Sequence, residues 1–276
     1  MPELPEVETV RRSLLPVILD KTITGVSVHY KRILRDISVR DFQTILVNNR
    51  FLDLKRRGKY LLFTLTGDWV MVAHLRMTGR LIYVSNREIP QAEHTSAAFD
   101  FADGSALRFE DVRKFATLNL VPAVRLQEIG GLHTLGVEPL AKEFTPELLG
   151  VMLKKSTAQI KGWLLDQKRI AGLGNIYSDE CLFLAGIHPQ RPANSLSKQE
   201  TAKLHEAIVH VLQDAIENQG TTLRDYRTGY GREGSFQNKL LVYGRKEEEC
   251  PRCGTDLKYK KVVGRTSHYC PRCQKE

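Results

Sequence analysis

The sequence predicts a multidomain α+β protein, and three observations point to this fold class. Apolar runs typical of strands fill much of residues 22–121, behind an amphipathic helix. Helical patterns follow a stretch rich in proline and glycine, and four of the five cysteines lie near the C-terminus. With 276 residues and 42% hydrophobic content, the chain can bury a core, and its length favours two domains over one.

The first element is an amphipathic helix over residues 3–18. Its apolar residues at helical spacing are Leu4, Val7, Val10 and Leu14. Glu8 and Arg12 form an i,i+4 pair on another face.

The next hundred residues read as mainly β. Strand-like runs are TITGVSVHY, KYLLFTL, WVMVAHL, LIYV, the alternating AAFDFADGSALRF, and a last run ATLNLV. Asp103-Gly104 suits a two-residue hairpin turn, and VRDFQTILVN is a helical interruption. This half predicts a β-sandwich or barrel with helices attached.

From about residue 122 the pattern changes to a linker and then to helices. The residues that punctuate the linker are Pro122, Gly130, Gly131, Gly136 and Pro139. TPELLGVMLKK and QIKGWLLDQ predict two helices. Ser197 and Glu200 form a capping box before a helix that Gly220 can end. The apolar face of that helix contains Leu204, Ile208, Val211 and Ala215.

The C-terminal cysteines predict a metal site. Cys250, Cys253, Cys270 and Cys273 have the spacing C-x2-C-x16-C-x2-C, in which two pairs can surround one zinc ion. Four sulfur ligands leave no open position, so the zinc is expected to be structural, between two short hairpins tipped by the cysteine pairs. Two disulfides are the alternative, which the lack of an export signal disfavours. Cys181, among apolar residues, is expected to be buried.

The charge balance suggests a polyanionic partner. Lys and Arg number 41 against 32 Asp and Glu, for a net charge of +9 and a pI of about 9.3. A basic surface without any partner explains the charge equally well. No apolar run reaches the ~18 residues of a membrane helix, and the first 30 residues are too charged for a secretory signal, so we expect an intracellular protein.

The first eight residues, MPELPEVE, concentrate acidic groups that a helix start alone would explain, because carboxylates complement the helix dipole there. A catalytic interpretation begins with removal of Met1, which leaves Pro2 with a secondary amine. That amine could attack a sugar C1′ and form an iminium. Glu3 would then act as the general acid, and Glu6 would hold the amine or a water.

Six segments resemble the bacterial formamidopyrimidine-DNA glycosylases, enzymes that excise oxidised purines such as 8-oxoguanine and then cut the strand. They are PELPEVETVRR, RRGKYLLF around Lys59, HLRM at 74–77, DVRKF at 111–115, AGLGNIYSDE at 171–180 and GRTSHYCPRCQ at 264–274. They follow the family's order and cover essentially the whole chain.

This resemblance implies an N-terminal β-sandwich domain with the catalytic helix over residues 1–132. A helix-two-turn-helix DNA-binding domain over 133–236 and a four-cysteine zinc finger over 237–276 would follow. It also implies base excision from damaged double-stranded DNA through a Schiff base on the proline, then β,δ-elimination. The expected protein is a monomer in the bacterial cytoplasm, associated with the nucleoid through DNA and with no membrane contact.

The resemblance also implies roles for single residues. Pro2 would be the nucleophile and Glu3 the acid. Lys59 would act at the damaged nucleotide and as a proton donor in β-elimination, and Arg265 would grip phosphates and act in δ-elimination. The residues implied to fill the gap left by the extruded nucleotide are Met77, Arg113 and Phe115. The implied phosphate contacts are His74, His94, Lys161 and Asn175, the last with Gly172 and Gly174 beside it.

Ordinary interpretations compete with several of these roles. Lys59 alone would be a solvated strand lysine, Met77 and Phe115 would be core residues, and His94 would be a solvated loop histidine.

The chain departs from the family pattern at four places. Thr266-Ser267 replaces a common Gly-Thr, Thr78 replaces a frequent glutamate, and Ala116 replaces a usual glycine. The sequence RTGYGREGSFQ at 227–237 also differs from the family's usual sequence at this place. A positive φ after Arg265 would suit threonine poorly.

Three rival functions stay open. An enzyme of the endonuclease VIII type would favour oxidised pyrimidines, but PELPE rather than PEGPE argues against it. A non-catalytic nucleic-acid-binding protein would need no free proline amine. A hydrolytic metalloenzyme fits poorly with four cysteine ligands.

Overall fold

The computed structural model describes residues 1–275 and divides the chain into two compact units. The first contains residues 1–133 and 218–237, and the second contains residues 134–217 and the described residues from 238 onward. Within the described residues, no helix has both the length and the apolar character needed to cross a membrane.

The first unit is a β-sandwich, as the sequence predicts. Its four-stranded sheet has the order β1 (Ile23–Val28), β7 (Thr95–Phe101), β8 (Ala106–Asp111) and β6 (Gly79–Val84). Its five-stranded sheet has the order β2 (Leu34–Arg35), β9 (Thr117–Pro122), β5 (Trp69–His74), β4 (Tyr60–Leu65) and β3 (Phe51–Arg57). The β2–β9 pair is parallel, and the other pairs are antiparallel.

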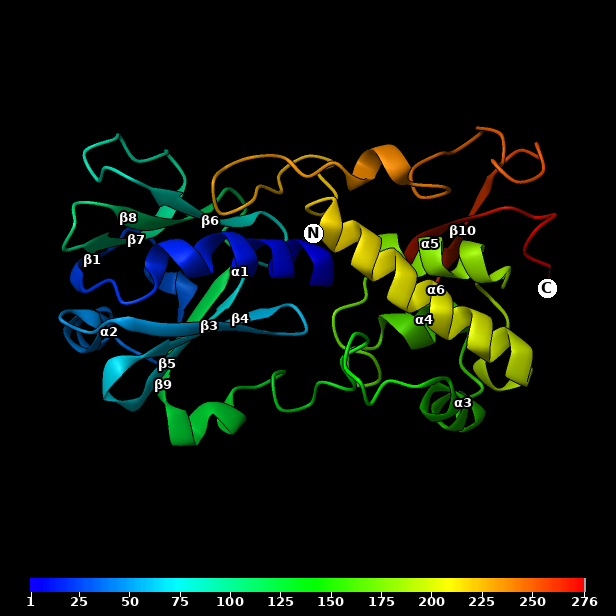
Figure 1. The fold of residues 1–276 in the computed structure, drawn as a ribbon, viewed down its shortest axis with the longest axis horizontal. Coiled ribbons are helices and arrows are strands. Elements are labelled where there is room, and N and C mark those ends of the chain that lie inside the picture. Colours follow the sequence, from blue (N-terminus) through cyan, green and yellow to red (C-terminus); the bar gives the residue numbers. More distant parts are fainter. Residues whose placement is uncertain (276) are drawn as a thin grey trace. The chain divides into compact units, whose positions relative to one another are not determined.

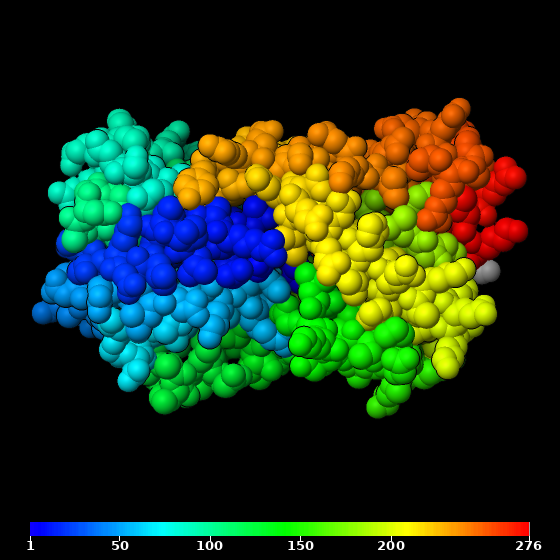
Figure 2. All heavy atoms as spheres, in the orientation of Figure 1, coloured from blue at the N-terminus to red at the C-terminus, as the bar shows by residue number. Residues whose placement is uncertain are grey.

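Helix α1 (Leu4–Ile18) lies along the sandwich between the two sheets (Figure 1). Its predicted apolar face is fully buried, because Leu4, Val7, Val10 and Leu14 each have 0% exposure. The outer side of α1 lies within a blue band at the surface, which borders sky-blue atoms along its lower side (Figure 2). A second helix, α2 (Val39–Leu46), matches the predicted helical interruption and is capped by Ser38.

Aromatic side chains fill the space between the sheets. In β4 buried and half-buried residues alternate, which places Leu61, Phe63 and Leu65 on the inner face. The ring centroids of Phe51 and Phe63 lie 5.4 Å apart, and Phe101 meets Phe51 edge-on. This core fixes the strands whose ends carry several predicted site residues.

The β7–β8 hairpin corrects the predicted two-residue turn. The N–H of Phe101 donates to Ser105 O at 2.9 Å, so three residues form the loop. Gly104 has a φ of 84°, as in the three-residue loop that ends with a left-handed residue. Asp103 also accepts the N–H of Ser105, which favours the longer loop.

Strands β2 and β3 were absent from the predicted set. β3 carries Lys55, Arg56 and Arg57, and its pairing shifts register between Phe51 and Asp53. Charges at the edge of a sheet and a bulge both disrupt the alternation that sequence reasoning looks for.

Residues 218–237 return to the first unit. Tyr226 belongs to its core, the N–H of Gly229 donates to Ser13 Oγ, and the N–H of Tyr83 donates to Gly229 O. These contacts tie residues 218–237 to helix α1 and to strand β6 of the first unit.

The second unit contains four helices and the cysteine-rich segment. The helices are α3 (Pro146–Lys154), α4 (Ile160–Leu165), α5 (Asn175–Ala185) and α6 (Lys198–Glu217). The predicted capping box is present, because Ser197 N donates to Glu200 Oε2 and Glu200 N donates to Ser197 Oγ. Across the described residues of both units, the 3₁₀ turns are Lys31–Ile33, Thr66–Asp68, Ala123–Glu128, Ala193–Ser195 and Phe236–Lys239.

The cysteine-rich segment has one regular hairpin, where the sequence suggested two. Strands β10 (Lys258–Val262) and β11 (Arg265–Tyr269) lie between the cysteine pairs, and each pair sits on a turn outside the hairpin. The segment packs on α5 through Phe183, which joins an apolar cluster with Val242 and Leu257.

Candidate active site and metal centre

The N-terminus begins α1 with two acidic residues that cap each other. Pro2 is buried, and Glu3 is the N-cap and is 2% exposed. Glu3 N donates to Glu6 Oε2 at 2.7 Å, and the Glu3 side chain accepts the N–H of Glu6. The capping box therefore fixes the backbone next to Pro2.

Glu6 also holds a distant segment of the same unit. Its Oε1 accepts the N–H of Thr221 at 2.8 Å, and the side chain is 1% exposed. A Cβ added to Gly220, whose φ is 79°, would lie 2.8 Å from Glu6 Oε1, so this approach requires glycine. Glu6 thus binds backbone groups on both sides, rather than only the amine or water that the sequence suggested.

Glu8 anchors α1 to β3. Its carboxylate accepts bonds from Arg11 and Arg12 of the helix and from Arg56 of β3. Burial alone would raise its pKa, but the bonds from Arg11 and Arg12 outweigh burial and lower it. The three N-terminal carboxylates therefore have different roles. Glu3 lies beside Pro2, Glu6 bridges two backbone segments, and Glu8 fixes the helix to β3.

Lys59 lies directly before β4, and His74 lies at the end of the neighbouring strand β5 of the five-stranded sheet. Lys59 follows Gly58 in the β3–β4 turn and is 6% exposed, which removes the interpretation as a solvated strand lysine. His74 ends β5 opposite Tyr60, with ring centroids 4.6 Å apart. Burial, followed by the charges of Arg76 and Lys59, lowers the pKa of His74 to about 3. Its Nδ1 accepts the N–H of Arg76, so the neutral ring carries its hydrogen on Nε2.

The three predicted gap-filling residues are exposed, which argues against their being core residues. Met77 is 37% exposed, Phe115 is 51% exposed, and Arg113 is exposed between them in sequence. The Arg113 guanidinium carbon lies 4.9 Å from the centroid of the Phe115 ring. Exposed large apolar residues of this kind mark binding surfaces when they cluster.

Two loops that carry these residues are tied together by Asp111 and Thr78. Thr78 Oγ1 donates to Asp111 Oδ1 and accepts the N–H of Arg113. Asp111 Oδ2 accepts the N–H of Ala116 at 2.7 Å. Thr78 is 5% exposed, so it stabilises the two loops from the protein interior. Ala116 does not have a positive φ, so alanine can replace the family's usual glycine there without strain.

His94 lies just before β7 and is half-buried. Its carbonyl accepts the N–H of Asp111 at 2.9 Å, so the loop histidine is tied to the end of β8, the strand that precedes Arg113.

Lys161 and Asn175 meet in the second unit. Lys161 is 0% exposed, and its Nζ donates to Asn175 O at 2.9 Å and to Asp179 Oδ1 at 2.6 Å. A direct phosphate contact by Lys161 would require that ion pair to open. Gly174 is the N-cap of α5 without a side-chain cap bond, and Gly172 has a φ of 92°. This helix start has the geometry that favours an anion.

Arg265 is exposed and is the first residue of β11, directly after a two-residue turn. The left-handed residues are Val263 and Gly264, with φ values of 47° and 74°. Thr266 is extended and pairs with Lys261, so the expected conflict between threonine and a positive φ does not arise. The strain falls on Val263, because a β-branched residue rarely adopts this conformation.

The four predicted cysteines form one metal site. Their sulfur atoms all lie within 4.8 Å of one another, with 3.9 Å between Cys250 and Cys273 and 3.5 Å between Cys253 and Cys270. A tetrahedron of four sulfurs about 2.3 Å from zinc has edges of about 3.8 Å, so the spacing fits this ion. Cys181 is 0% exposed and takes no part.

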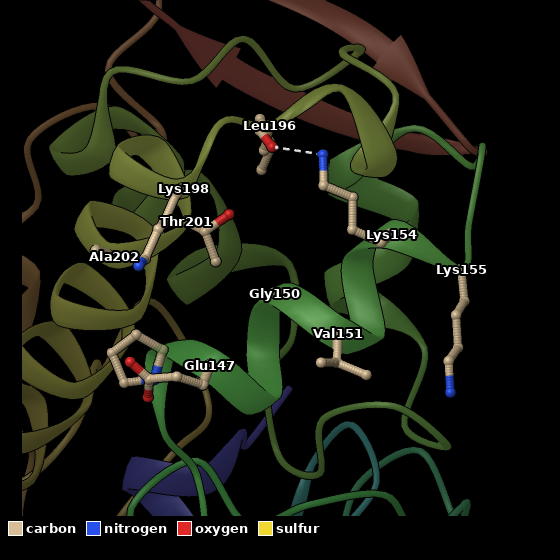
Figure 3. Close-up of a pocket in the computed structure, with 10 residues that line it drawn as sticks. Glu147, Gly150, Val151, Lys154, Lys155, Leu196, Lys198, Thr201 and Ala202 are labelled. Atoms are coloured by element: carbon tan, nitrogen blue, oxygen red, sulfur yellow. Dashed lines mark hydrogen bonds between the residues drawn. The ribbon is translucent and has the colours of Figure 1, made fainter.

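A groove of about 640 Å³ in the second unit lies apart from these residues (Figure 3). It is formed by α3 and the start of α6, and Lys154 donates to the carbonyl of Leu196 at one end. None of the predicted site residues lines it, so we assign it no part in the chemistry.

Several residues of these sites were not singled out from the sequence. They are Arg56, Asp111, Asp179, Glu180 and Thr221. Asp111 begins DVRKF, and Asp179 and Glu180 end AGLGNIYSDE, so their places in the motifs were the available signal.

Three family models match successive parts of the chain. They describe the formamidopyrimidine-DNA glycosylase N-terminal domain at residues 1–118, the formamidopyrimidine-DNA glycosylase H2TH domain at 135–227, and a zinc finger found in FPG and IleRS at 247–275.

Relatives and solved structures agree with these models. A formamidopyrimidine-DNA glycosylase of Brevibacillus brevis is 50% identical, with 100% of this chain and 99% of the relative covered. One of Cytobacillus firmus is 49% identical, with 99% and 100% covered. The Lactococcus lactis Fpg in complex with abasic-site DNA superposes with a TM-score of 0.92 at 37% identity, covering 99% of this chain and 100% of that one. The chain therefore belongs to the formamidopyrimidine-DNA glycosylase family.

Proposed function

We propose that this protein is a bifunctional DNA glycosylase of base-excision repair. It removes oxidised purines, such as 8-oxoguanine and formamidopyrimidines, from duplex DNA and then cleaves the abasic strand by β,δ-elimination. Family membership supports this activity, and one observation of this chain supports it most directly. Pro2 is followed by a buried Glu3 whose backbone is fixed by Glu6 at the start of a helix.

The chemical step starts from the amine that Pro2 gains when Met1 is removed. Its lone pair forms a bond to C1′ of the damaged nucleotide while the bond between C1′ and the base breaks, and the amine proton passes to the leaving base. Glu3 then protonates the ring oxygen, the bond between C1′ and that oxygen breaks, and the nitrogen lone pair forms an iminium. The resulting iminium acidifies the 2′ hydrogen, whose loss expels the 3′ phosphate in β-elimination. A further elimination expels the 5′ phosphate.

We assign Lys59 as the proton donor for β-elimination and Arg265 as the residue that grips phosphates and assists δ-elimination. Burial of Lys59 and the exposed position of Arg265 are compatible with these roles. Glu6 keeps Glu3 in place rather than touching the substrate.

Extrusion of a damaged nucleotide leaves a gap in the stack that costs a few kcal/mol. We propose that Met77, Arg113 and Phe115 fill it, with the guanidinium of Arg113 facing the orphaned base. Their exposure and the stacking of Arg113 on Phe115 support this assignment.

The DNA backbone would be held by groups in both units. His74 and His94 belong to the first, and Asn175 with the start of α5 belongs to the second. Lys161 supports that start through the carbonyl of Asn175, and it could reach phosphate itself only by leaving Asp179. When bound, one zinc ion cross-links the four cysteines and stabilises the segment that carries Arg265.

The sequence and the comparisons also support a setting for the activity. We propose that the protein acts as a monomer in the bacterial cytoplasm, at the nucleoid through its DNA substrate.

Borohydride trapping tests the proposal, because it reduces an iminium to a stable amine. Purified protein would be incubated with a duplex that carries 8-oxoguanine opposite cytosine, and any adduct would be located by peptide mass spectrometry. We expect an adduct on Pro2 in chains that lack Met1. Binding without cleavage or adduct, on this duplex and on an abasic one, would leave a DNA-binding protein without catalysis. Preference for oxidised pyrimidines would indicate an activity of the endonuclease VIII type.

A further inference from the structure

Two adjacent acidic residues of α5 are buried and belong to none of the catalytic roles above. Asp179 is 1% exposed and Glu180 is 2% exposed. Buried carboxylates are costly unless they are paired or hydrogen-bonded, so their partners indicate what they hold.

Asp179 connects three elements of the second unit. Its Oδ1 accepts the ammonium of Lys161 in α4 at 2.6 Å, and its Oδ2 accepts the N–H of His268 in β11 at 3.0 Å. Lys161 also donates to Asn175 O, so the same ion pair supports the helix start.

Glu180 holds the segment that leads into the cysteine-rich region. Its carboxylate accepts the N–H groups of Leu241, Val242 and Tyr243, at distances of 2.8, 3.0 and 2.8 Å. Three consecutive backbone donors around one carboxylate fix this segment to α5 without any metal.

The hairpin also contacts the helix start directly. Asn175 Nδ2 donates to Thr266 O at 3.0 Å, and Thr266 follows Arg265 in β11. The hydrogen bonds of Asp179, Lys161 and Asn175 therefore connect the start of α5 with β11, the strand that begins with Arg265.

We propose that Asp179 and Glu180 are positioning residues that dock the β10–β11 hairpin on α5, so that Arg265 and the start of α5 engage the DNA backbone as one unit. Zinc alone would stabilise the turns that bear the cysteines, but the carboxylates set where the hairpin lies on the helix. This inference rests on the proposed function for the role of Arg265.

The test replaces the buried ion pair by apolar residues, with Lys161→Met and Asp179→Leu in one chain. Removing both charges avoids leaving an unpaired buried ammonium, while His268 N–H loses its acceptor. Asp214→Asn is the matched control. Asp214 of α6 pairs with Lys239 at 2.7 Å, just before the segment that Glu180 holds, but this carboxylate is partly exposed.

Four quantities would be measured on full-length protein: zinc content, affinity for a duplex with a reduced abasic site, the fraction of δ-product, and the borohydride trapping rate at saturating DNA. We expect one zinc per chain, about tenfold weaker binding, and a fall in the δ-product fraction that exceeds any fall in the trapping rate. Hydrogen exchange of the hairpin amides should rise, with α6 unchanged.

In an Arg265→Ala background the paired substitution should lower the δ-product fraction no further, because both changes act through one residue. Unchanged binding and δ-product in the paired variant would overturn the proposal. Loss of zinc would overturn it too, since the carboxylates would then act only by maintaining the metal site. Failure of the unmodified chain to form any adduct would instead count against the proposed function.

Discussion

Glu6 and Thr221 are joined by a 2.8 Å hydrogen bond although they lie 215 positions apart in the chain. The same carboxylate accepts the N–H of Glu3, so the segment after α6 helps to fix the backbone beside Pro2. The position of Pro2, the proposed nucleophile, is thus fixed both by the N-terminal residues and by the segment around Thr221.

Glu6→Gln should disturb this arrangement with little change in volume. An amide NH2 must face one of two backbone N–H donors, so one charge-assisted bond of about 1.5–3 kcal/mol is lost. We expect a lower melting temperature and at least tenfold slower borohydride trapping. Glu88→Gln is the control, because the Glu88 side chain is 80% exposed. Trapping at the normal rate in Glu6→Gln would show that the capping box does not position Pro2.

Arg113→Ala and Phe115→Ala should separate duplex opening from chemistry. Loss of one gap-filling contact worth about 1.4 kcal/mol slows excision about tenfold. We expect that loss with 8-oxoguanine in a duplex and a smaller one in single-stranded DNA, where no base pair is opened. Val112→Ala is the control, because Val112 is 48% exposed on the same loop. Equal losses on both substrates would contradict a gap-filling role.

His74 should make folding stability depend on pH. Its pKa is about 3 in the folded chain and about 6.5 when unfolded, so the unfolded chain binds more protons between these values. The stability that neutral His74 provides is complete above pH 6.5 and is lost as the pH falls toward 3.

The free energy of unfolding of His74→Asn should therefore be lower than that of the unmodified chain at pH 7.5, and the difference should be smaller at pH 4.5. Urea unfolding at both pH values measures this difference in free energy. His210→Asn is the control, because His210 is exposed. A difference independent of pH would mean that His74 does not titrate in this way.

Zinc removal should weaken DNA binding without abolishing the proline chemistry. A loosened hairpin loses the phosphate bond of Arg265, worth about 1.5–3 kcal/mol, or roughly tenfold or more in affinity. Cys253→Ser should behave like chelated protein, whereas Cys181→Ala should keep one zinc per chain. Metal analysis and DNA titration check both, and a zinc content that Cys253→Ser leaves intact would argue against the four-cysteine site.

The turn before Arg265 offers two opposite changes. Val263→Asn should relieve the left-handed strain by about 1 kcal/mol and raise the melting temperature. Gly162→Ala should weaken DNA binding, because its Cβ would lie 2.7 Å from Val263 Cγ2 and displace the turn. In the control Gly150→Ala, the added Cβ would lie 3.7 Å from Thr201 Cγ2, an ordinary contact. Unaltered binding in Gly162→Ala would show that the turn tolerates the shift.

Short stretches of the sequence were enough to predict the local elements and the class of chemistry. Helix α1, the capping box at Ser197 and the cysteine spacing depend on residues within a few positions of one another, so their patterns are readable without a fold. The motif order likewise indicated the family before any geometry.

The exposure of each side chain, and the carboxylates that bind distant backbone groups, depend on how the elements pack together. Phe115 is exposed while Lys59 and Lys161 are buried, because the packing of neighbouring elements, not the motif, sets solvent access. The bonds from Glu6 to Thr221 and from Asp179 to His268 join residues far apart in sequence. No local pattern encodes such pairs, since they exist only once the packed core has fixed both backbones.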